Sequence, residues 1–493
     1  MKLVILPLDS RPCTREFPAQ LAQSAGISAC VPPLEVMDWY RTPSDFSRIA
    51  AWLEEACAGA GALICSLDQL AYGGLLASRC MEVTEPQALR RAAFLRRLKQ
   101  KYPALDIYLS SVIMRTTVST LKQEDQIWWE KVALYSQLAA QPGCEAARRL
   151  AQLEAQIPPH VLQTFLAARD RNHQVNREAV ALLAEGIVKQ VCFLQEDSAP
   201  QGLHRAEQQR LCALAEAQGV SEQVSLHCGT DECACALVGC LAAQHRAGEP
   251  ALRLYVEWLA GDVQFTARYE DRPFAENLDA YLKTCRITRV QSPKDAQAVL
   301  AVYAPSGPQL DLATAPEDAA CAYTPGQLGS IAARLQALLD TGLPTGLLDV
   351  YHANGGESAF LRLAAKNGLL ARLAAYAGWN TACNSLGTIL GQLLAAGSGA
   401  SSGDALAAFT QERLLDDWVY QAIVRPRWNR ELRAAGTDIW ALQDVPGANA
   451  RLQQLMELAP EAHLVCSRPF RAQLCWPRTF EASIAICKEG ESI

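Results

Sequence analysis

Short apolar segments alternate with amphipathic helical segments along most of this chain, and no other feature constrains the fold as strongly. Strand-type runs that each precede a helical pattern occur at residues 3–8, 27–31, 62–67, 106–113, 190–194, 224–228, 252–258, 298–303 and 346–351. Such alternation is typical of parallel strands connected by helices, so it predicts an α/β fold. We favour a (β/α)8-like barrel with a helical insertion and a C-terminal helical and β extension. A doubly wound parallel sheet is the alternative that the same pattern allows.

Interruptions of this alternation set the expected domain organisation. Residues 1–115 read as the first βα units of a catalytic domain, whereas residues 116–189 contain helical patterns only and predict an insertion. The remaining βα units are expected at 190–396. A Ser/Gly run at 397–403 is expected to be a linker, and 404–493 a C-terminal extension with helices and short strands, one of them at 462–466.

Composition limits the partners that this chain is expected to have. The net charge of the 493 residues is −7, and no run of Lys and Arg is long enough to follow a phosphate backbone, so nucleic acid is not expected. No uninterrupted apolar stretch reaches the roughly 18 residues that span a bilayer, so no membrane partner is expected. The 18 cysteines lack framework spacing and predict reduced thiols in a cytoplasmic protein. The composition leaves room for a homo-oligomer.

Polar side chains of the kinds that bind small hydroxylated molecules follow several of the predicted strands. If these strands are parallel, their carboxyl ends share one edge, and the side chains meet there. Carbohydrate sites use carboxylates, Arg and Asn for hydroxyl groups, and Trp or Tyr as a platform for the sugar ring. The substrate-binding candidates are Asp9, Arg11, Asp68, Tyr72, Arg79, Arg115, Glu196, Asp197, Asn354, Trp379 and Asn380, with Tyr72 and Trp379 as platforms.

Two adjacent carboxylates, Asp231 and Glu232, follow the strand predicted at 224–228 and precede a helical run. Neighbouring carboxyl groups resist ionising together, which raises one pKa and separates a proton donor from an ionised partner. Cleavage of glycosides needs such a pair. The alternative is that both acids cap the following helix, where its dipole favours negative charge.

The segment His227-Cys-Gly-Thr-Asp-Glu232 resembles the His-x-Gly-Gly-Asp-Glu signature of β-N-acetylhexosaminidases that use the acetamido group of the substrate as nucleophile. Thr230 stands where that signature has its second Gly. The resemblance implies that Asp231 orients the acetamido group and that Glu232 protonates the leaving oxygen. It also matches Asp9 and Arg11 to an Asp and a sugar-binding Arg after the first barrel strand of that family.

A second acid pair, Glu196-Asp197, follows the strand predicted at 190–194 and competes with Asp231-Glu232 for the catalytic role. Together with Asp231 it also suggests an alternative in which carboxylates bind Mg²⁺. Zinc spacing, a dinucleotide fingerprint, a Walker loop and a nucleophile elbow are all absent from the sequence, so no cofactor is expected.

The whole chain is also similar to a bacterial family of about this length whose function is uncharacterised. The motifs that carry this similarity are Pro7-Leu-Asp-Ser-Arg-Pro12, Ser66-Leu-Asp-Gln-Leu-Ala-Tyr-Gly-Gly74 with Ser78-Arg79, Gly229-Thr-Asp-Glu232, Asn354-Gly-Gly356, Tyr376-Ala-Gly-Trp-Asn-Thr381 and Trp476-Pro-Arg-Thr-Phe-Glu481. They extend from one end of the chain to the other, which favours one integral unit of enzyme type.

These observations together predict a glycoside hydrolase that acts on a small carbohydrate, most specifically an exo-acting β-N-acetylhexosaminidase-like enzyme with retention of configuration. Asp231 and Glu232 are its predicted catalytic residues. A divalent-metal-dependent lyase, isomerase or hydrolase and a sugar-binding protein without activity are the two alternatives.

Overall fold

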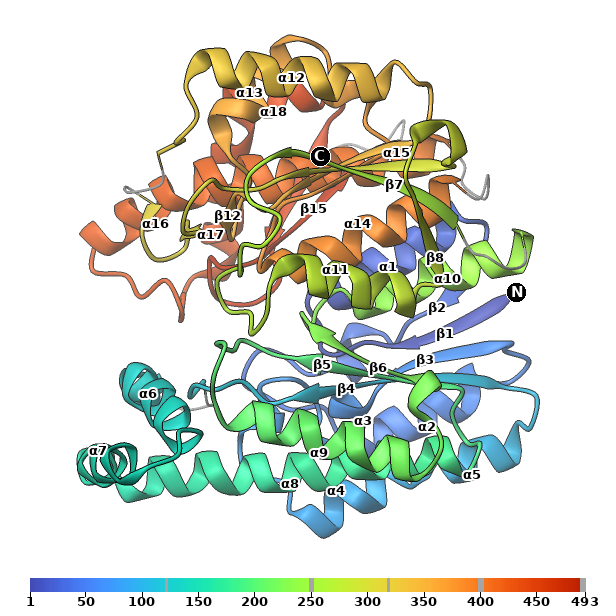
Figure 1. The fold of residues 1–493 in the computed structure, drawn as a ribbon, viewed down its shortest axis with the longest axis vertical. Helices are drawn as coiled ribbons and strands as arrows, with labels where there is room; N and C mark the ends of the chain where they lie inside the picture. Colours follow the sequence, from blue (N-terminus) through green and yellow to red (C-terminus); the bar gives the residue numbers. More distant parts are fainter. Residues whose placement is uncertain (120–122, 248–251, 317–319, 398–402, 488–493) are drawn as a thin grey trace. The chain divides into compact units, whose positions relative to one another are not determined.

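A computed structural model describes residues 1–119, 123–247, 252–316, 320–397 and 403–487 (Figure 1). Within these residues the chain divides into two compact units. Unit 1 comprises residues 1–10, 27–234 and 269–272. Unit 2 comprises residues 11–26, 235–268 and 273–493. The predicted linker at 397–403 lies almost entirely outside the described residues.

Unit 1 is built on a sheet of six parallel strands in the order β2-β1-β3-β4-β5-β6. In chain order the strands are β1 (Lys2–Leu6), β2 (Ser28–Cys30), β3 (Ala62–Ser66), β4 (Asp106–Ile113), β5 (Gln190–Gln195) and β6 (Val224–Cys228). The inner strands are apolar and almost fully buried, as expected for parallel strands that are covered by helices. The strand order reverses between β1 and β3. After β1 the chain adds β2 on one side, whereas after β3 it adds β4, β5 and β6 on the other side.

The helices of unit 1 cover one face of this sheet, below the strands in Figure 1. They are α2 (Phe46–Ala56), α3 (Leu67–Tyr72), α4 (Glu85–Ala92), α5 (Phe94–Lys101), α8 (Pro159–Ala184) and α9 (Leu203–Ala217). Their apolar faces pack against Leu63, Leu109 and Phe193 of the sheet. The region in which only helices were predicted also contains α6 (Trp129–Ala139) and α7 (Cys144–Glu154). Helix α8 packs on β4 and β5 and is the helix that crosses over between these two parallel strands. Helices α6 and α7 are therefore the inserted part of this connection.

Unit 2 is built on a second sheet of five parallel strands, in the order β13-β11-β9-β7-β8. In chain order they are β7 (Leu252–Ala260), β8 (Ile287–Val290), β9 (Ala298–Tyr303), β11 (Thr345–Asp349) and β13 (Ala375–Ala377). If these five strands are numbered by their order in the chain, their order across the sheet from the β8 edge is second, first, third, fourth, fifth. The first five strands of unit 1 follow the same order, a structural repetition that the sequence does not reveal.

Helices cover both faces of the unit 2 sheet. On one face α14 (Ala382–Gly397) lies so close that a side chain at Gly346 would meet Ile389 at 3.1 Å. On the other face α12 (Pro325–Leu339) and α13 (Ser358–Lys366) form the largest core with Tyr303 and Leu347. The remaining helices of unit 2 are α1 (Pro12–Ser24), α10 (Cys233–Ala247), which begins in the last residues of unit 1, α11 (Phe274–Thr284), α15 (Gly403–Arg413), α16 (Arg425–Ala434), α17 (Val445–Glu457) and α18 (Pro460–Val465).

A π-helical segment, η8 (Leu414–Val424), joins α15 to α16. Small pairs of strands complete the unit: β10 (Leu310–Asp311) with β12 (His352–Ala353), and β14 (Phe470–Leu474) with β15 (Ala482–Ile486).

The expected α/β class is confirmed, whereas the closed barrel was wrong. The two large sheets of the described residues are separate and parallel, and β2 and β6 at the borders of the first each pair with a single neighbour. Alternating strands and helices look alike in sequence whether a sheet closes or stays open, so the doubly wound alternative matches the topology. The strand predicted at 462–466 was also wrong, because Pro460 begins helix α18 there.

Candidate functional site

The carboxyl ends of the unit 1 strands place most of the predicted site residues along one edge of the sheet. Asp9 follows β1, Asp68 and Arg79 follow β3, and Arg115 follows β4. Glu196 and Asp197 follow β5, and Asp231 and Glu232 follow β6. Since β3, β4, β5 and β6 are neighbours in the sheet, their ends are neighbours as well. Ligands of open α/β sheets bind at this edge, particularly where the strand order reverses.

Two arginines hold Glu196 in unit 1. The Arg79 guanidinium donates to one carboxylate oxygen of Glu196, and the backbone N–H of Arg115 donates to the other at 3.1 Å. The Arg115 guanidinium lies 3.8 Å from Glu196 and also pairs with Asp197. Burial alone would lower the pKa of Arg115, but the charges of Asp197 and Glu196 outweigh it and raise that pKa. Glu196 and Asp197 therefore lie in an ion-pair network with Arg79 and Arg115.

Asp68 has the opposite character. Its carboxyl group lies in the first turn of α3, which Ser66 caps, and it accepts a 2.8 Å hydrogen bond from the backbone N–H of Val112. Burial raises the pKa of Asp68 to about 7, and the nearby charge of Glu196 adds to the increase. Asp68 is therefore a carboxyl group that exchanges its proton near neutral pH. The predicted sugar platform Tyr72 packs in the same region with the Arg171 guanidinium 4.4 Å over its ring, which covers one ring face.

Asp231 and Glu232 lie just before α10, and both side chains are buried. The Glu232 carboxylate folds back over the backbone of Gly229, where a Cβ would be 2.7 Å from its oxygen. Gly229 has a φ of +92°, so this close approach and the left-handed turn both require glycine. The hydroxyl of Thr230 donates to Asp231 at 3.3 Å. A position at the start of a helix also suits the capping alternative.

The sequence did not reveal a further polar cluster in unit 1, around Asp271. Arg272 and Gln208 donate to its carboxylate at 2.6 and 2.7 Å, and His204 lies 3.5 Å away. Burial would raise the pKa of Asp271, but the contacts of His204 and Arg272 outweigh it and lower that pKa. The Cys228 thiol, at the end of β6, donates to Asp271 at 3.3 Å. Asp271 lies in an irregular segment without a motif, so no sequence signal marks it.

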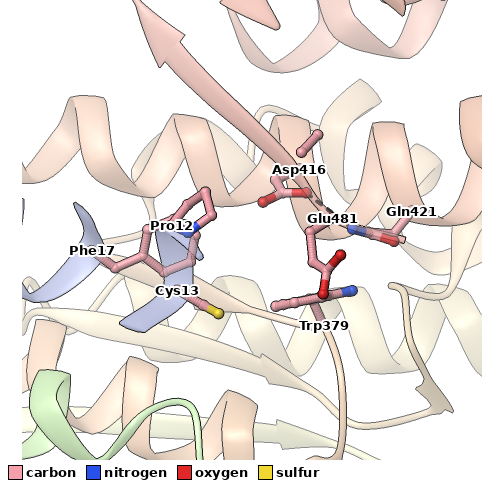
Figure 2. A pocket seen from close by; sticks show the side chains of 8 residues that line it. Pro12, Cys13, Phe17, Trp379, Asp416, Gln421 and Glu481 are labelled. Carbon is pink, nitrogen blue, oxygen red and sulfur yellow. Dashed lines mark hydrogen bonds between the residues drawn. The ribbon is translucent and has the colours of Figure 1, made fainter. Parts of the chain in front are cut away.

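In unit 2 a small pocket joins four separate segments of the chain (Figure 2). The side chains pack so closely around it that it has no room for a water molecule. The lining residues are Pro12, Cys13, Phe17, Trp379, Asp416, Gln421, Glu481 and Ala482. Three of the motifs that the sequence singled out contribute to this set, through Pro12, Trp379 and Glu481.

Arginines compensate both carboxylates of this pocket. Arg478 contacts both oxygens of Glu481, and Arg11 lies 3.7 Å from the same group. Arg413 donates to Asp416 at 2.9 Å and to Asp417 at 3.1 Å. Burial raises the pKa of Asp416, and it raises the pKa of Asp417 to about 7, against the opposing charge of Arg413. One arginine thus serves two carboxyl groups that compete for ionisation.

The helix that carries Asp416 and Gln421 is unusual, because η8 is π-helical over 11 residues. Hydrogen bonds in a π-helix close a wider turn than in an α-helix, and such segments are rare and are often found at functional sites. The Gln421 side chain donates to Asp416 and to the backbone of Phe480, at 3.3 Å in each case. The sequence did not predict this segment, which reads as an ordinary helix.

Of the predicted substrate-binding residues in unit 2, Trp379 lines this pocket and Arg11 contacts one of its carboxylates. Asn354 and Asn380 lie together, with the Asn354 backbone N–H donating to the Asn380 carbonyl at 2.9 Å. Both have left-handed backbones, with φ values of +62° and +67°. Asn tolerates the left-handed region better than most residues. The turns at these two positions are therefore a structural reason for Asn there, beside the predicted role in substrate binding.

Among the described residues, no group of three or more His, Cys, Asp or Glu side chains is arranged to hold a metal ion. The Mg²⁺ alternative relied on Glu196, Asp197 and Asp231, and the first two lie in the arginine network. No helix in the described part of the chain is long and apolar enough to cross a membrane. All 18 cysteines lie within the described residues and are thiols rather than disulfides.

The two sheets and their charged edges define a class of protein: a two-unit α/β protein with parallel sheets and buried carboxyl groups near strand ends. Within that class, residues 3–485 match the model of the family described as "Protein of unknown function (DUF4127)". This match covers nearly the whole chain, so the protein belongs to the DUF4127 family. No curated protein matches the chain.

Proposed function

We propose that this protein is a glycoside hydrolase whose acid–base chemistry takes place at the carboxyl edge of the unit 1 sheet. One observation carries the proposal: this edge holds both a carboxyl group with a pKa of about 7, Asp68, and a carboxylate fixed among arginines, Glu196. Glycosidic cleavage needs a proton donor near neutral pH and an ionised carboxylate that stabilises positive charge on the sugar.

The most specific form of the proposal assigns the reaction to Asp231 and Glu232, as in acetamido-assisted β-N-acetylhexosaminidases. Its support is their position at the end of β6, beside β5, with both carboxyl groups buried. The rival pair Glu196-Asp197 is less suited to proton donation, because both groups lie in the arginine network. Glu232 is then the general acid and base, Asp231 orients the acetamido group, and Glu196 contributes fixed negative charge.

Hydrolysis of 4-nitrophenyl glycosides tests both forms. The panel includes both anomers of N-acetylglucosamine and N-acetylgalactosamine. We expect release from a β-N-acetyl substrate, with kcat reduced about 100-fold or more in Glu232→Gln and Asp231→Asn. Glu216→Gln and Asp170→Asn change exposed carboxylates of unit 1 and serve as matched controls that keep wild-type rates.

The variants also separate the specific form from the general one. Activity that survives Glu232→Gln and Asp231→Asn but is lost in Asp68→Asn moves the acid to Asp68 and rejects the acetamido-assisted form. No hydrolysis of any glycoside by the folded wild-type protein rejects the proposal as a whole. Parallel assays with a chelator and with added Mg²⁺ show whether a divalent cation contributes.

A further inference from the structure

Helix α8 carries two arginines, Arg169 and Arg171, whose side chains are buried beside the carboxyl edge of the unit 1 sheet. They are 2% and 1% exposed. Arginine is almost never buried this completely unless a partner compensates its charge. The contacts of the two guanidinium groups therefore show what holds them there.

Arg171 donates all five of its N–H groups, and its acceptors are backbone carbonyls and one amide oxygen. Nη1 donates to the carbonyls of Cys80 and Val83 at 2.5 and 2.8 Å, and Nη2 donates to that of Ser78. Nε and Nη2 also donate to the side-chain oxygen of Asn172, at 3.0 and 2.8 Å. Burial lowers the pKa of Arg171, so its charge costs free energy that these bonds offset.

Two of the carbonyls that Arg171 binds flank Arg79, an arginine of the Glu196 network. Ser78 and Cys80 are the two neighbours of Arg79 in the chain. Because both neighbouring carbonyls are held, the direction in which the Arg79 side chain leaves the backbone is fixed. The Arg79 guanidinium donates to Glu196, and neither side chain is more than 5% exposed. Arg171 therefore acts on Glu196 through Arg79.

Arg169 holds the second arginine of the network in a similar way. Its Nη1 donates to the carbonyls of Met114 and Arg115 at 3.0 and 2.7 Å, directly after β4. Nε and Nη2 contact the two carboxylate oxygens of Glu207 on α9, at 2.7 Å each, which anchors the guanidinium. Arg115 in turn lies 3.8 Å from Glu196. Each arginine that contacts Glu196 is thus held by an arginine of the same helix.

The inserted helices α6 and α7 support the same segment. Met114 and Val118, which lie on either side of Arg115, belong to an apolar core that also contains side chains of α6, α7 and α8. Phe165 of this core lies one turn before Arg169, whose guanidinium is 5.6 Å from the centre of its ring. The segment that carries Arg115 is therefore held both by apolar packing and by hydrogen bonds from Arg169.

We propose that Arg169 and Arg171 are positioning residues of unit 1, which hold the backbone beside Arg115 and Arg79 so that both guanidinium groups reach Glu196. This role sets the charge at the edge where the acid–base chemistry is proposed to take place, and it rests on the proposed function for its effect on hydrolysis. The arrangement itself is tested without hydrolysis.

The pKa of Asp68 reports on this arrangement. Burial raises the pKa of this carboxyl group most, and the charge of Glu196 raises it further, whereas the Val112 N–H and the charge of Arg171 lower it. The Tyr72 hydroxyl also interacts with Asp68, but it stays neutral because burial raises its own pKa. Carbon-13 NMR of the full chain, labelled at the aspartate carboxyl carbons, follows the pKa of Asp68, and Asp68→Asn assigns the signal.

Arg171→Lys is the decisive variant, because it keeps the positive charge, but one ammonium group cannot bind three carbonyls in the fixed geometry of a guanidinium. Arg79 should then lose its contact with Glu196, whose charge becomes less compensated, and the pKa of Asp68 should rise by roughly one unit. Arg171→Met also removes the charge and should raise this pKa further. Arg169→Lys should shift it in the same direction as Arg171→Lys, and it provides the test if the Arg171 variants do not fold.

Leu182→Ala is the matched structural control. It removes a fully buried side chain of the same helix, and it should lower the urea midpoint without moving the pKa of Asp68. Arg177→Met changes an exposed arginine of α8 and should alter neither quantity.

Three outcomes overturn the proposal. They are an unchanged pKa of Asp68 in either lysine variant that folds, an equal shift in Leu182→Ala, and a rise in Arg171→Met that is absent from Arg171→Lys, which would assign the effect to charge alone. A rise in the lysine variants of a protein that hydrolyses no glycoside supports the positioning role and rejects only the proposed hydrolase.

Discussion

The Asp417 carboxylate accepts a 2.9 Å hydrogen bond from the backbone N–H of Gly378. This bond ties the π-helix η8 to the turn after β13, directly before Trp379. Arg413 donates to the other oxygen of the same carboxylate at 3.1 Å. The unusual helix and the aromatic wall of the pocket are thus held together by one buried side chain.

Replacing Asp417 by Ala should therefore destabilise unit 2. The change leaves the Gly378 N–H and part of the Arg413 guanidinium without their partner, and we expect a loss of about 2–4 kcal/mol in the free energy of unfolding. Urea titration followed by circular dichroism measures it. Asp404→Ala, an exposed acid of the preceding helix, should change stability by less than about 0.5 kcal/mol. Equal stability of the two variants would contradict the role given to this bond.

The Glu196 network predicts a contrast between buried and exposed ion pairs. Glu196→Gln leaves Arg79 buried without its charged partner, which should cost about 3–5 kcal/mol. Glu185→Gln removes one of the two carboxylate partners of Arg96 at the surface of the same unit, where the cost should stay below about 1 kcal/mol. Urea midpoints of the two variants provide the comparison. A small loss for Glu196→Gln would show that the network is not a structural ion pair.

The sequence predicted the strand ends of unit 1 because each strand there is a compact apolar run followed by a polar residue. Asp68, Glu196 and Glu232 were placed in this way. The division into two sheets was missed, since β8 and β13 have four and three residues and carry little pattern of their own. Asp416 was missed because a π-helix has no composition signal. Glu481 lay within a recognised motif, but only the fold brings that motif to Trp379.

Asp68 should make the stability of the protein depend on pH. Its pKa of about 7 in the folded chain exceeds the ordinary value of 3.8, so between about pH 4 and pH 7 the folded state holds a proton that the unfolded state has released. Stability should therefore fall as pH rises through this window. The contribution of this carboxyl group is at most about 4 kcal/mol.

Unfolding free energies of the wild type and Asp68→Asn at pH 5 and pH 8 test this sign. Asn resembles the protonated carboxyl group and does not titrate, so the variant should lose less stability than the wild type between the two values. Asp170→Asn, an exposed residue, should retain the wild-type difference. Equal stability changes of wild type and Asp68→Asn between pH 5 and pH 8 would show that Asp68 is already ionised in the folded state at pH 5.

Close helix packing in unit 2 leads to the last prediction. A Cβ at Gly391 of α14 would lie 2.5 Å from the backbone oxygen of Cys235 and 2.9 Å from Leu21. Ala favours helix over Gly by about 1 kcal/mol, but here the backbone contact must open, so Gly391→Ala should destabilise the protein by about 1–3 kcal/mol. A Cβ at Gly329 of α12 would meet nothing within 4 Å, and Gly329→Ala should therefore be neutral or stabilising by up to about 1 kcal/mol. The thermal midpoint should rise or stay the same in Gly329→Ala and fall in Gly391→Ala. Shifts in these two directions would show that helix propensity decides the outcome at Gly329 and the helix contact decides it at Gly391. Stabilisation by both changes would mean that the helices at Gly391 are farther apart than this packing requires.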